Sequence, residues 1–293
     1  RWRFRRYCGG VGGRGGGDCG FISSVVLSRP QRAESRFILF TMSTTNNSQN
    51  LVERLFAAGA HFGFAKSRRH PSVKPYLFGN KQGTDIFDLE KTAALITEAK
   101  TALEAAGKDG KTVLFVSTKD ESSALVKAEA LRAESPYVVN RWIGGMLTNF
   151  QEIKKRIDRL HQLTVEGESG ELERKYTKKE RVMIGREIDK LQFNFGGIKD
   201  LEKTPDMLVV VDPRHEQIAV REANDIAVPV VGVMSSDNNL EHVQYPVVAN
   251  DALQASLSII MTELVDAYVA GKEAFVPKKE PARTTRRTTR SDG

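Results

Sequence analysis

The chain has 293 residues, of which 40% are hydrophobic and 28% are charged, which is enough for one large α/β domain with a substantial core. No stretch approaches the roughly 18 uninterrupted apolar residues of a membrane span, so we expect no transmembrane segment and no membrane partner. The formal net charge of +7 suggests a nucleic-acid partner, but the distribution of that charge decides what it means.

The positive charge is concentrated at the two ends of the chain. Residues 1–41 carry eight arginines and two acidic residues, and residues 277–293 carry six basic and two acidic residues. Residues 42–276 hold 30 basic and 33 acidic side chains, so this part is not basic. A nucleic-acid function must therefore rest on local patches and on the two ends.

The amino-terminal segment has the composition of a leader. It combines an arginine-rich start, a glycine-rich run over residues 9–17, and both cysteines of the chain, Cys8 and Cys19. Two interpretations stay open: an upstream extension that ends before Met42, which the glycine run favours, or an organellar transit peptide. The GxGxxG match at residues 10–15 follows no predicted strand, so we expect no dinucleotide site there. The lack of cysteine elsewhere fits a reducing compartment and excludes a disulfide scaffold.

From residue 51 onward, the apolar pattern predicts alternating helices and strands. We expect helices over residues 51–60, 90–106, 120–133, 214–224 and 251–270, and strands over residues 84–89, 112–118, 137–140, 207–212 and 228–234. Several of these strands are continuously apolar, as in strands that are buried on both faces. The alternation predicts a parallel sheet covered by helices on both sides.

A different pattern interrupts this alternation. Two charged helices carry apolar seams at intervals of three and four, separated by the turn signal EGESGE: Phe150, Ile153, Ile157, Leu160 and Thr164, then Ile184, Ile188, Leu191 and Phe195. Because so narrow a seam covers a sheet face poorly, the pattern predicts an antiparallel helical hairpin that protrudes from the body.

These patterns divide the chain into four parts. We expect a disordered basic and glycine-rich leader over residues 1–50 and a disordered basic tail over residues 273–293. The α/β domain is expected over residues 51–150 and 196–272, with the helical hairpin inserted over residues 151–195.

Residues 54–84 contain no acidic residue. They carry interleaved aromatic residues and six cations, which are Arg54, Lys66, Arg68, Arg69, Lys74 and Lys81. Prolines 71 and 75 predict an irregular loop that can present cations to phosphates and aromatic rings to unpaired bases. The alternative is a solvated loop whose aromatic residues pack on the sheet, and charge alone does not separate the two.

Two further motifs follow predicted strands. In RWIGGMLTN (residues 141–149), the glycines permit a tight turn, while the Arg-Trp pair suits either an internal cation–π contact or a base platform. In DPRHE (residues 212–216), the aspartate stands where α/β enzymes place catalytic groups, but Asp-Pro is also an ordinary helix start, and we favour the capping role.

Enzyme and metal signatures are weak. The segment after residue 118 lacks the glycines of a P-loop, and no GxSxG or HExxH motif is present, so we expect no catalytic residue and no cofactor. The five histidines lie in separate segments, so we also expect no metal ion. A site assembled from His242, Glu241 and Asp251 stays open as an alternative.

Several stretches together resemble the family of small-subunit ribosomal protein two (the S-two family). They include AGAHFGF (58–64), SRRHPSVKPYLFG (67–79), YVVNRWIGGMLTNF (137–150) and FGGIKDLEKTPDMLVVVD (195–212), in the order of the family. The resemblance implies a flavodoxin-like three-layer α/β/α fold with a protruding helical hairpin. It also implies a structural constituent of the small ribosomal subunit, with that subunit's ribosomal RNA and neighbouring ribosomal proteins as partners.

The resemblance also implies which residues contact RNA. Those that match the family's motifs are Lys66, Arg68, Arg69, Lys74, Arg141, Trp142 and Asn149. Two departures, Phe64 in place of a histidine and Ser235 in place of an aspartate, put in doubt a metal site or the docking of ribosomal protein S-one through those side chains. A nucleotide-dependent enzyme on a doubly wound fold is the alternative, and it would need a glycine-rich phosphate loop that the sequence does not contain.

Overall fold

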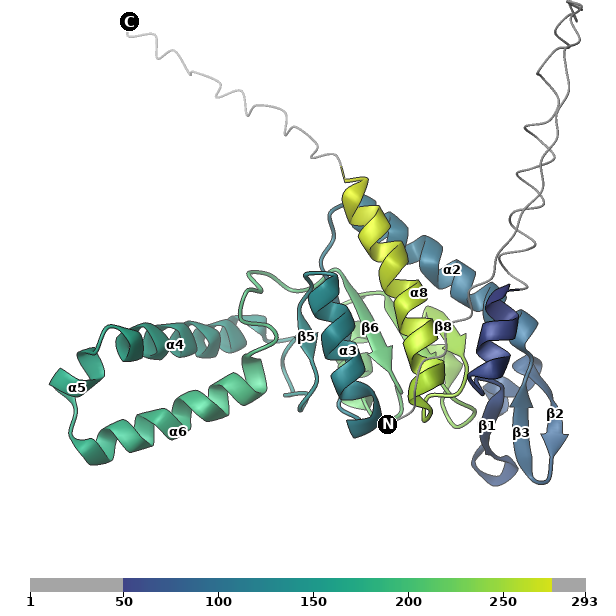
Figure 1. Ribbon diagram of the computed structural model, residues 1–293, viewed down its shortest axis with the longest axis horizontal. Coiled ribbons are helices and arrows are strands. Elements are labelled where there is room, and N and C mark those ends of the chain that lie inside the picture. Colours follow the sequence, from purple (N-terminus) through teal and green to yellow (C-terminus); the bar gives the residue numbers. More distant parts are fainter. Residues whose placement is uncertain (1–49, 276–293) are drawn as a thin grey trace, which may run out of the picture. The chain divides into compact units, whose positions relative to one another are not determined.

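The computed structural model describes residues 50–275, so the expectations for the leader and the basic tail lie outside the described residues. Five strands form a parallel sheet in the order β5-β4-β6-β7-β8 (Figure 1). Their bounds are Val113–Val116 for β4, Tyr137–Val138 for β5, Met207–Val211 for β6, Val230–Met234 for β7 and Tyr245–Val248 for β8. The sheet predicted from the apolar runs is therefore confirmed. Strand β8 escaped prediction because Pro246 interrupts a short run, and a proline is tolerated there because β8 is an edge strand.

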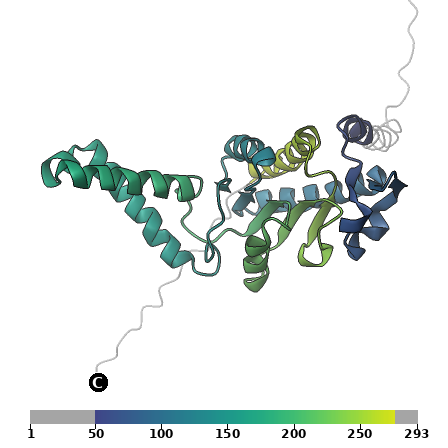
Figure 2. The same ribbon diagram turned by 90° about the horizontal axis from the view of Figure 1, so that it is seen from below.

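Helices cover both faces of the sheet. Figure 2 shows α7 and α8 on opposite sides of the strands. Residues 50–57 are helical, as predicted for the start of the domain. The helices that follow in the body are α2 (Leu89–Lys108), α3 (Asp120–Arg132), α7 (Gln217–Asp225) and α8 (Gln254–Glu273). Among residues 50–275, no helix has the length and apolar character needed to cross a bilayer.

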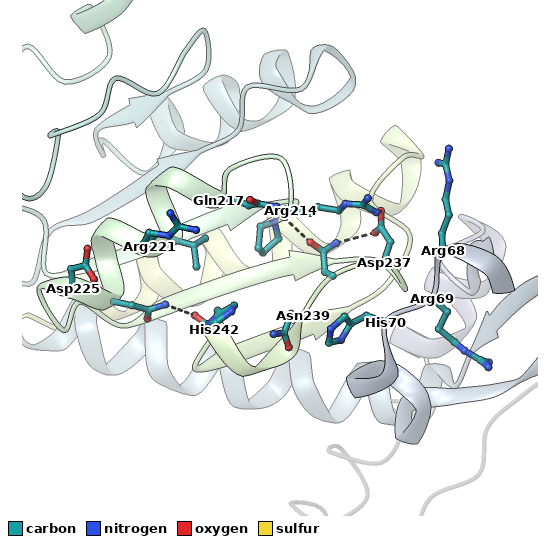
Figure 3. A pocket seen from close by; sticks show the side chains of 14 residues that line it. Arg68, Arg69, His70, Arg214, Gln217, Arg221, Asp225, Asp237, Asn239 and His242 are labelled. Atoms are coloured by element: carbon teal, nitrogen blue, oxygen red, sulfur yellow. Dashed lines mark hydrogen bonds and ion pairs between the residues drawn. The ribbon is translucent and has the colours of Figure 1, made fainter.

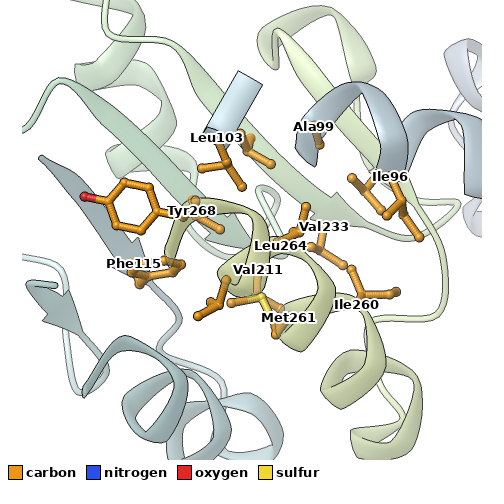
Figure 4. Close-up of a cluster of buried hydrophobic side chains, with 14 of the residues drawn as sticks. Ile96, Ala99, Leu103, Phe115, Val211, Val233, Ile260, Met261, Leu264 and Tyr268 are labelled. Carbon is orange, nitrogen blue, oxygen red and sulfur yellow. The ribbon is translucent and has the colours of Figure 1, made fainter. Parts of the chain in front are cut away.

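The side chains of β6 supply both cores in alternation. Val209 and Val211 belong to the cluster under α2, α3 and α8 (Figure 4), whereas Leu208 and Val210 belong to the cluster under α7. All four side chains are buried. This two-residue period is what a strand buried on both faces requires, and it produces the three layers.

Helix α2 ends at Lys108, two residues past its predicted end, and a glycine in its last turn lets another helix approach. A Cβ atom on Gly107 would lie 2.7 Å from the carbonyl oxygen of Tyr268 in α8, and one on Gly271 would lie 2.4 Å from a carbonyl of α2. The two glycines therefore allow backbone contact between α2 and α8.

The acid-free segment departs from its prediction. An antiparallel sheet in the order β1-β3-β2 forms around the expected irregular loop, with β1 at Phe62–Ala65, β2 at Leu77–Lys81 and β3 at Thr84–Phe87. The loop itself is limited to residues 66–76. The strand predicted over residues 84–89 is present as β3, but it belongs to this antiparallel sheet and not to the parallel sheet, as the prediction had it. The missed signal is the two-residue turn of Gln82 and Gly83, both with positive φ (53° and 82°), which is typical of hairpin connections.

The helical hairpin is present. Figure 1 shows α4 (Phe150–Glu168) and α6 (Lys178–Phe195) joined through the short α5 (Glu171–Lys175). The predicted seam is correct except at its end, where Leu163 is buried and Thr164 is exposed. An α-helix with 3.6 residues per turn brings Leu163 rather than Thr164 under the partner helix.

Candidate nucleic-acid interface

Two short 3₁₀ helices, η1 (Lys66–Arg68) and η2 (Pro71–Tyr76), connect β1 to β2. Backbone and hydroxyl hydrogen bonds hold this loop against the segment that follows β7. The amide of His70 donates to the carbonyl of Ser236 at 2.8 Å, and the amide of Leu240 donates to Oγ of Ser72 at 3.2 Å. A third bond runs from the amide of Phe64 to Oγ of Ser236 at 2.9 Å. The loop is therefore fixed before any ligand arrives.

Three cations of this loop are free to bind an anion. Lys66, Arg68 and Lys74 are exposed, and none has an ion-pair partner among the described residues. The guanidinium of Arg68 lies 5.9 Å from the centroid of the Phe64 ring, a cation–π contact that leaves its N–H groups available. The three predicted RNA contacts Lys66, Arg68 and Lys74 are thus exposed cations without an acidic partner in the described part of the chain.

Arg69 differs from its neighbours. Its Nη1 lies 3.4 Å from Oδ1 of Asp85, whose side chain is fully buried. Asn80 donates to the same carboxylate oxygen at 3.0 Å, and the other oxygen has no hydrogen-bond partner. The charge of Arg69 neutralises a buried carboxylate, so its position is explained by the fold itself.

The loop RWIGGMLTN wraps around a carboxylate from α7. Glu222 is buried, and its Oε1 accepts hydrogen bonds from the Gly145 amide at 2.8 Å and from Nε1 of Trp142 at 3.3 Å. Its Oε2 accepts from the Leu147 amide at 3.1 Å and from the Thr148 amide at 3.5 Å. The φ of 92° at Gly145 favours glycine there. Sequence analysis missed this partner because it lies more than 70 residues away along the chain.

This arrangement separates the three candidate residues of the motif. The side chain of Trp142 is only 7% exposed, so its ring packs in the core and offers no face to a base. Arg141 and Asn149 are exposed. Asn149 stands at the N-cap of α4, and its side chain makes no capping hydrogen bond.

The carboxyl ends of the parallel strands hold a group of buried charges. Strand order reverses between β4 and β6, which is where α/β enzymes bind ligands. Nζ of Lys119, after β4, lies 2.6 Å from Oδ2 of Asp212, after β6, and 3.1 Å from Oδ2 of Asp251. Burial and the nearby charge of Asp212 raise the pKa of Asp251 to about 6. Burial lowers the pKa of Lys119, but its bonds and charge interactions with the two aspartates outweigh this and raise it.

Neighbouring contacts fill the rest of this position. Glu216 is buried and accepts hydrogen bonds from both the amide and the hydroxyl of Thr118. Asp212 accepts from the amides of Arg214 at 3.2 Å and His215 at 3.4 Å. The favoured role of Asp212 as the N-cap of the following helix is wrong: α7 begins at Gln217 and its N-cap is Glu216. Asp212 instead has a positive φ of 57° and accepts the amides of the turn that precedes the helix. The charged and polar side chains at the ends of β4 and β6 are thus paired with one another.

Metal ligands are not assembled in the part of the chain that the structure covers. Residues 50–275 contain no group of three or more His, Cys, Asp or Glu side chains placed to share an ion. The alternative site of His242, Glu241 and Asp251 is therefore wrong.

Comparison with known proteins assigns the family. A family model described as Ribosomal protein S2 matches residues 55–271. The chain belongs to the ribosomal protein S2 family. Among curated relatives, the small ribosomal subunit protein uS2 of Petrotoga mobilis is 40% identical over 225 residues, which cover 77% of this chain and 78% of the relative. The protein of the same name from Picosynechococcus sp. is 40% identical over 221 residues, 75% of this chain and 86% of that one.

A third relative extends the match. The uS2 of Psychrobacter cryohalolentis is 38% identical over 232 residues, which cover 79% of this chain and 88% of the relative. As a member of the S2 family, the protein is a structural ribosomal component and not an enzyme.

The structure of this S2 family member also brings together cations that the sequence analysis did not group. A groove of about 720 Å³ lies between the loop of residues 66–76, α7 and the segment after β7 (Figure 3). Four arginines line it: Arg68 and Arg69 from the loop, and Arg214 and Arg221 from the region of α7. The last two were missed because helix-surface arginines are common and only the fold places them beside the loop.

Proposed function

We propose that this protein is a constituent of the small ribosomal subunit and binds that subunit's ribosomal RNA through Lys66, Arg68 and Lys74. The supporting observation is a rigid, acid-free loop whose three exposed cations have no ion-pair partner among residues 50–275. Phosphate contacts supply most of the affinity of proteins for nucleic acids, and they need cations that the protein does not neutralise.

Two other residues support the proposal less strongly. Arg141 and Asn149 are exposed at the two ends of the loop around Glu222, and we propose them as additional contacts. Trp142 acts indirectly, because its ring and its bond to Glu222 hold the loop that carries both. Arg69 likewise acts by neutralising Asp85 and keeping the loop in place.

The partners follow from the same proposal. Neighbouring proteins of the small subunit are expected to contact the remaining surface. If ribosomal protein S-one docks, it uses a surface other than Ser235 and Ser236, because both side chains are buried. The ribosome of the cytoplasm is the proposed location, with an organellar ribosome as the alternative. Sedimentation of a lysate tests the membership of the small subunit, by showing whether the protein travels with that subunit.

A charge-matched pair of variants tests the RNA contact. In the first variant, Lys66, Arg68 and Lys74 are replaced by Ala. In the control, three exposed cations of the helical hairpin, Arg156, Lys179 and Lys190, are replaced by Ala. Both lose three positive charges. We expect the loop variant alone to bind ribosomal RNA more weakly, with a log–log salt slope smaller by roughly 2 to 3. Equal weakening in both variants would mean that net charge, not the loop, determines binding.

A further inference from the structure

We infer that the arginine-lined groove between the loop of residues 66–76 and α7 binds one unstacked nucleotide of single-stranded RNA. This inference rests on the proposed function and names the part of the RNA that the site takes. The groove's volume of about 720 Å³ lies within the range of about 300–1,000 Å³ that small-molecule pockets show. A concave site of this size accepts a base that has left its stack, whereas a duplex presents a convex surface.

A free guanidinium stands on the α7 side of the groove. Arg221 is exposed and has no ion-pair or hydrogen-bond partner among the described residues. Arg214 instead pairs with Asp237, with 2.7 Å between Nη1 and Oδ2. Arg221 is therefore the group of α7 that can take a phosphate with its planar fork of donors.

Neutral polar side chains provide the second half of the site. Gln217 and His242 line the same groove as Arg221 (Figure 3). Both are exposed, and neither side chain has a hydrogen-bond partner among residues 50–275. Amide and imidazole groups can donate to and accept from the edges of an unpaired base. A site for inorganic phosphate alone would not need them.

His70 presents a defined donor from the opposite wall. Its Nδ1 accepts from the amide of Ser72 at 3.3 Å and lies 2.7 Å from the hydroxyl of the same residue. With Nδ1 acting as the acceptor, the proton of a neutral imidazole is on Nε2. The Nε2–H group has no protein partner in the described chain, and the ring lines the groove.

The walls are held in place before binding. The amide of Arg214 donates to Oδ1 of Asn238 at 2.7 Å, and Asn238 is buried. Nδ2 of Asn224 donates to the carbonyl of His242 at 3.0 Å. With the bonds from His70 and Leu240 described above, three chain segments are connected across the groove. A fixed site loses little conformational entropy when a ligand binds.

The lining favours a nucleotide over an acidic peptide. The apolar residues that line the groove are Pro213 and Val220, and both are buried. Peptide sites need pockets for apolar anchors, whereas phosphate, sugar and base edges can bond to the arginine, amide and imidazole groups present here. Two carboxylates also line the groove: Asp237 is paired with Arg214, and Asp225 can accept from a sugar hydroxyl or a base amino group.

The test uses the full chain and two point variants. The probe is a short, labelled, mixed-sequence single-stranded RNA, titrated over a salt series, with the matching duplex as a second probe. We expect Arg221→Ala to weaken single-strand binding about tenfold and to lower the salt slope by about 0.7. Gln217→Ala should weaken binding without changing that slope, because it removes a base contact and no charge. The exposed hairpin variant Arg186→Ala is the charge-matched control and should change neither.

The possible outcomes separate this inference from the proposed function. Loss of binding in the Lys66, Arg68 and Lys74 variant, with normal binding in both groove variants, would overturn the groove site and leave the proposed function standing. No RNA binding by the unaltered chain would overturn both. Equal losses on duplex and single strand would reject the unstacked nucleotide. If adenosine monophosphate competes with the affinity of the oligomer, the groove binds a free nucleotide. If polyglutamate competes with that affinity, the groove binds an acidic peptide. Either result would overturn the claim.

Discussion

Two charged regions of this S2 family protein are organised in opposite ways. At the carboxyl ends of β4 and β6, Lys119 lies within 3.1 Å of two buried aspartates and is ion-paired with both inside the protein. On the loop of residues 66–76, Lys66 and Arg68 are exposed and have no acidic partner within the described chain. At the position where α/β enzymes bind ligands the charges are paired within the protein, whereas a surface loop carries unpaired charge.

The comparison shows why fold alone is a poor guide to function. A parallel sheet creates a crevice at its switch point whatever the protein does, and here the charged groups at that crevice are held in ion pairs and in the bonds of Glu216 with Thr118. Cations that contact a ligand must have no internal partner. We therefore expect substitutions of these paired groups to change stability, and substitutions of free loop cations to change RNA binding.

The largest expected effect is that of Lys119→Ala. It leaves Asp212 and Asp251 buried together without a cation, and breaking a buried pair in this way costs about 3 to 5 kcal/mol of unfolding free energy. Denaturant unfolding at neutral pH measures the loss, and the deficit should shrink as the pH falls and an aspartate takes up a proton. Lys66→Ala, an exposed control, should change stability by less than about 0.5 kcal/mol. A deficit of the same size in both variants would contradict the comparison.

The second prediction concerns Asp251, whose pKa is raised from 3.8 to about 6 in the folded protein. Because the folded state holds this proton more tightly than the unfolded state, Asp251 lowers stability as the pH rises from about 4 to about 6. The loss approaches about 3 kcal/mol above that range and then stays constant. Asp251→Asn removes the titration, so the variant should gain stability relative to the original chain over this range. Parallel pH curves for the two proteins would show that the aspartate does not titrate there.

How much could be predicted from sequence depended on how local each signal was. The apolar runs of β4, β6 and β7 and the period of the hairpin are visible within a few residues, so the sheet and the hairpin were predictable. Strand β8 and the small antiparallel sheet were not, because proline, glycine and short length hide their period. The local charge pattern also selected Lys66, Arg68 and Lys74, which are exposed and unpaired in the part of the chain described. Their contact with RNA stays a prediction.

Long-range partners account for what the sequence did not reveal. Arg69 and Arg68 are neighbours with the same chemistry, but the fold places Asp85 beside only one of them. The sequence alone does not distinguish a buried Trp142 from an exposed base platform, and its hydrogen bond to the buried Glu222 decides between them. Arg221 becomes notable only once α7 lies beside the loop of residues 66–76. In each case the deciding contact joins segments that the local pattern treats separately.

A third prediction tests whether the RWIGGMLTN motif serves the fold. Glu222→Gln replaces one of two accepting oxygens by an NH₂ group, which faces donors such as the amides of Leu147 and Thr148. Losing hydrogen bonds to a charged group should lower the unfolding free energy by about 2 kcal/mol. Faster hydrogen exchange at the amides of Gly145 and Leu147, compared with those of β6, would place the damage in this loop. Unchanged exchange at these amides would rule out the carboxylate as the centre of the motif.

The smallest effects distinguish two adjacent arginines. Arg69→Ala leaves the buried Asp85 with only the amide of Asn80 as a partner, so we expect a loss of about 1 to 2 kcal/mol in unfolding free energy. Arg68→Ala removes an exposed cation–π contact with Phe64, worth about 0.5 to 1 kcal/mol at most. For RNA the order should reverse when the variants are compared under conditions where both are fully folded. Arg68→Ala should then lower the log–log salt slope by about 0.7 to 0.9, and Arg69→Ala should leave it unchanged. If Arg69→Ala changes the slope as much as Arg68→Ala, its guanidinium contacts phosphate as well as Asp85, and neutralisation by an internal partner does not exclude a cation from the interface.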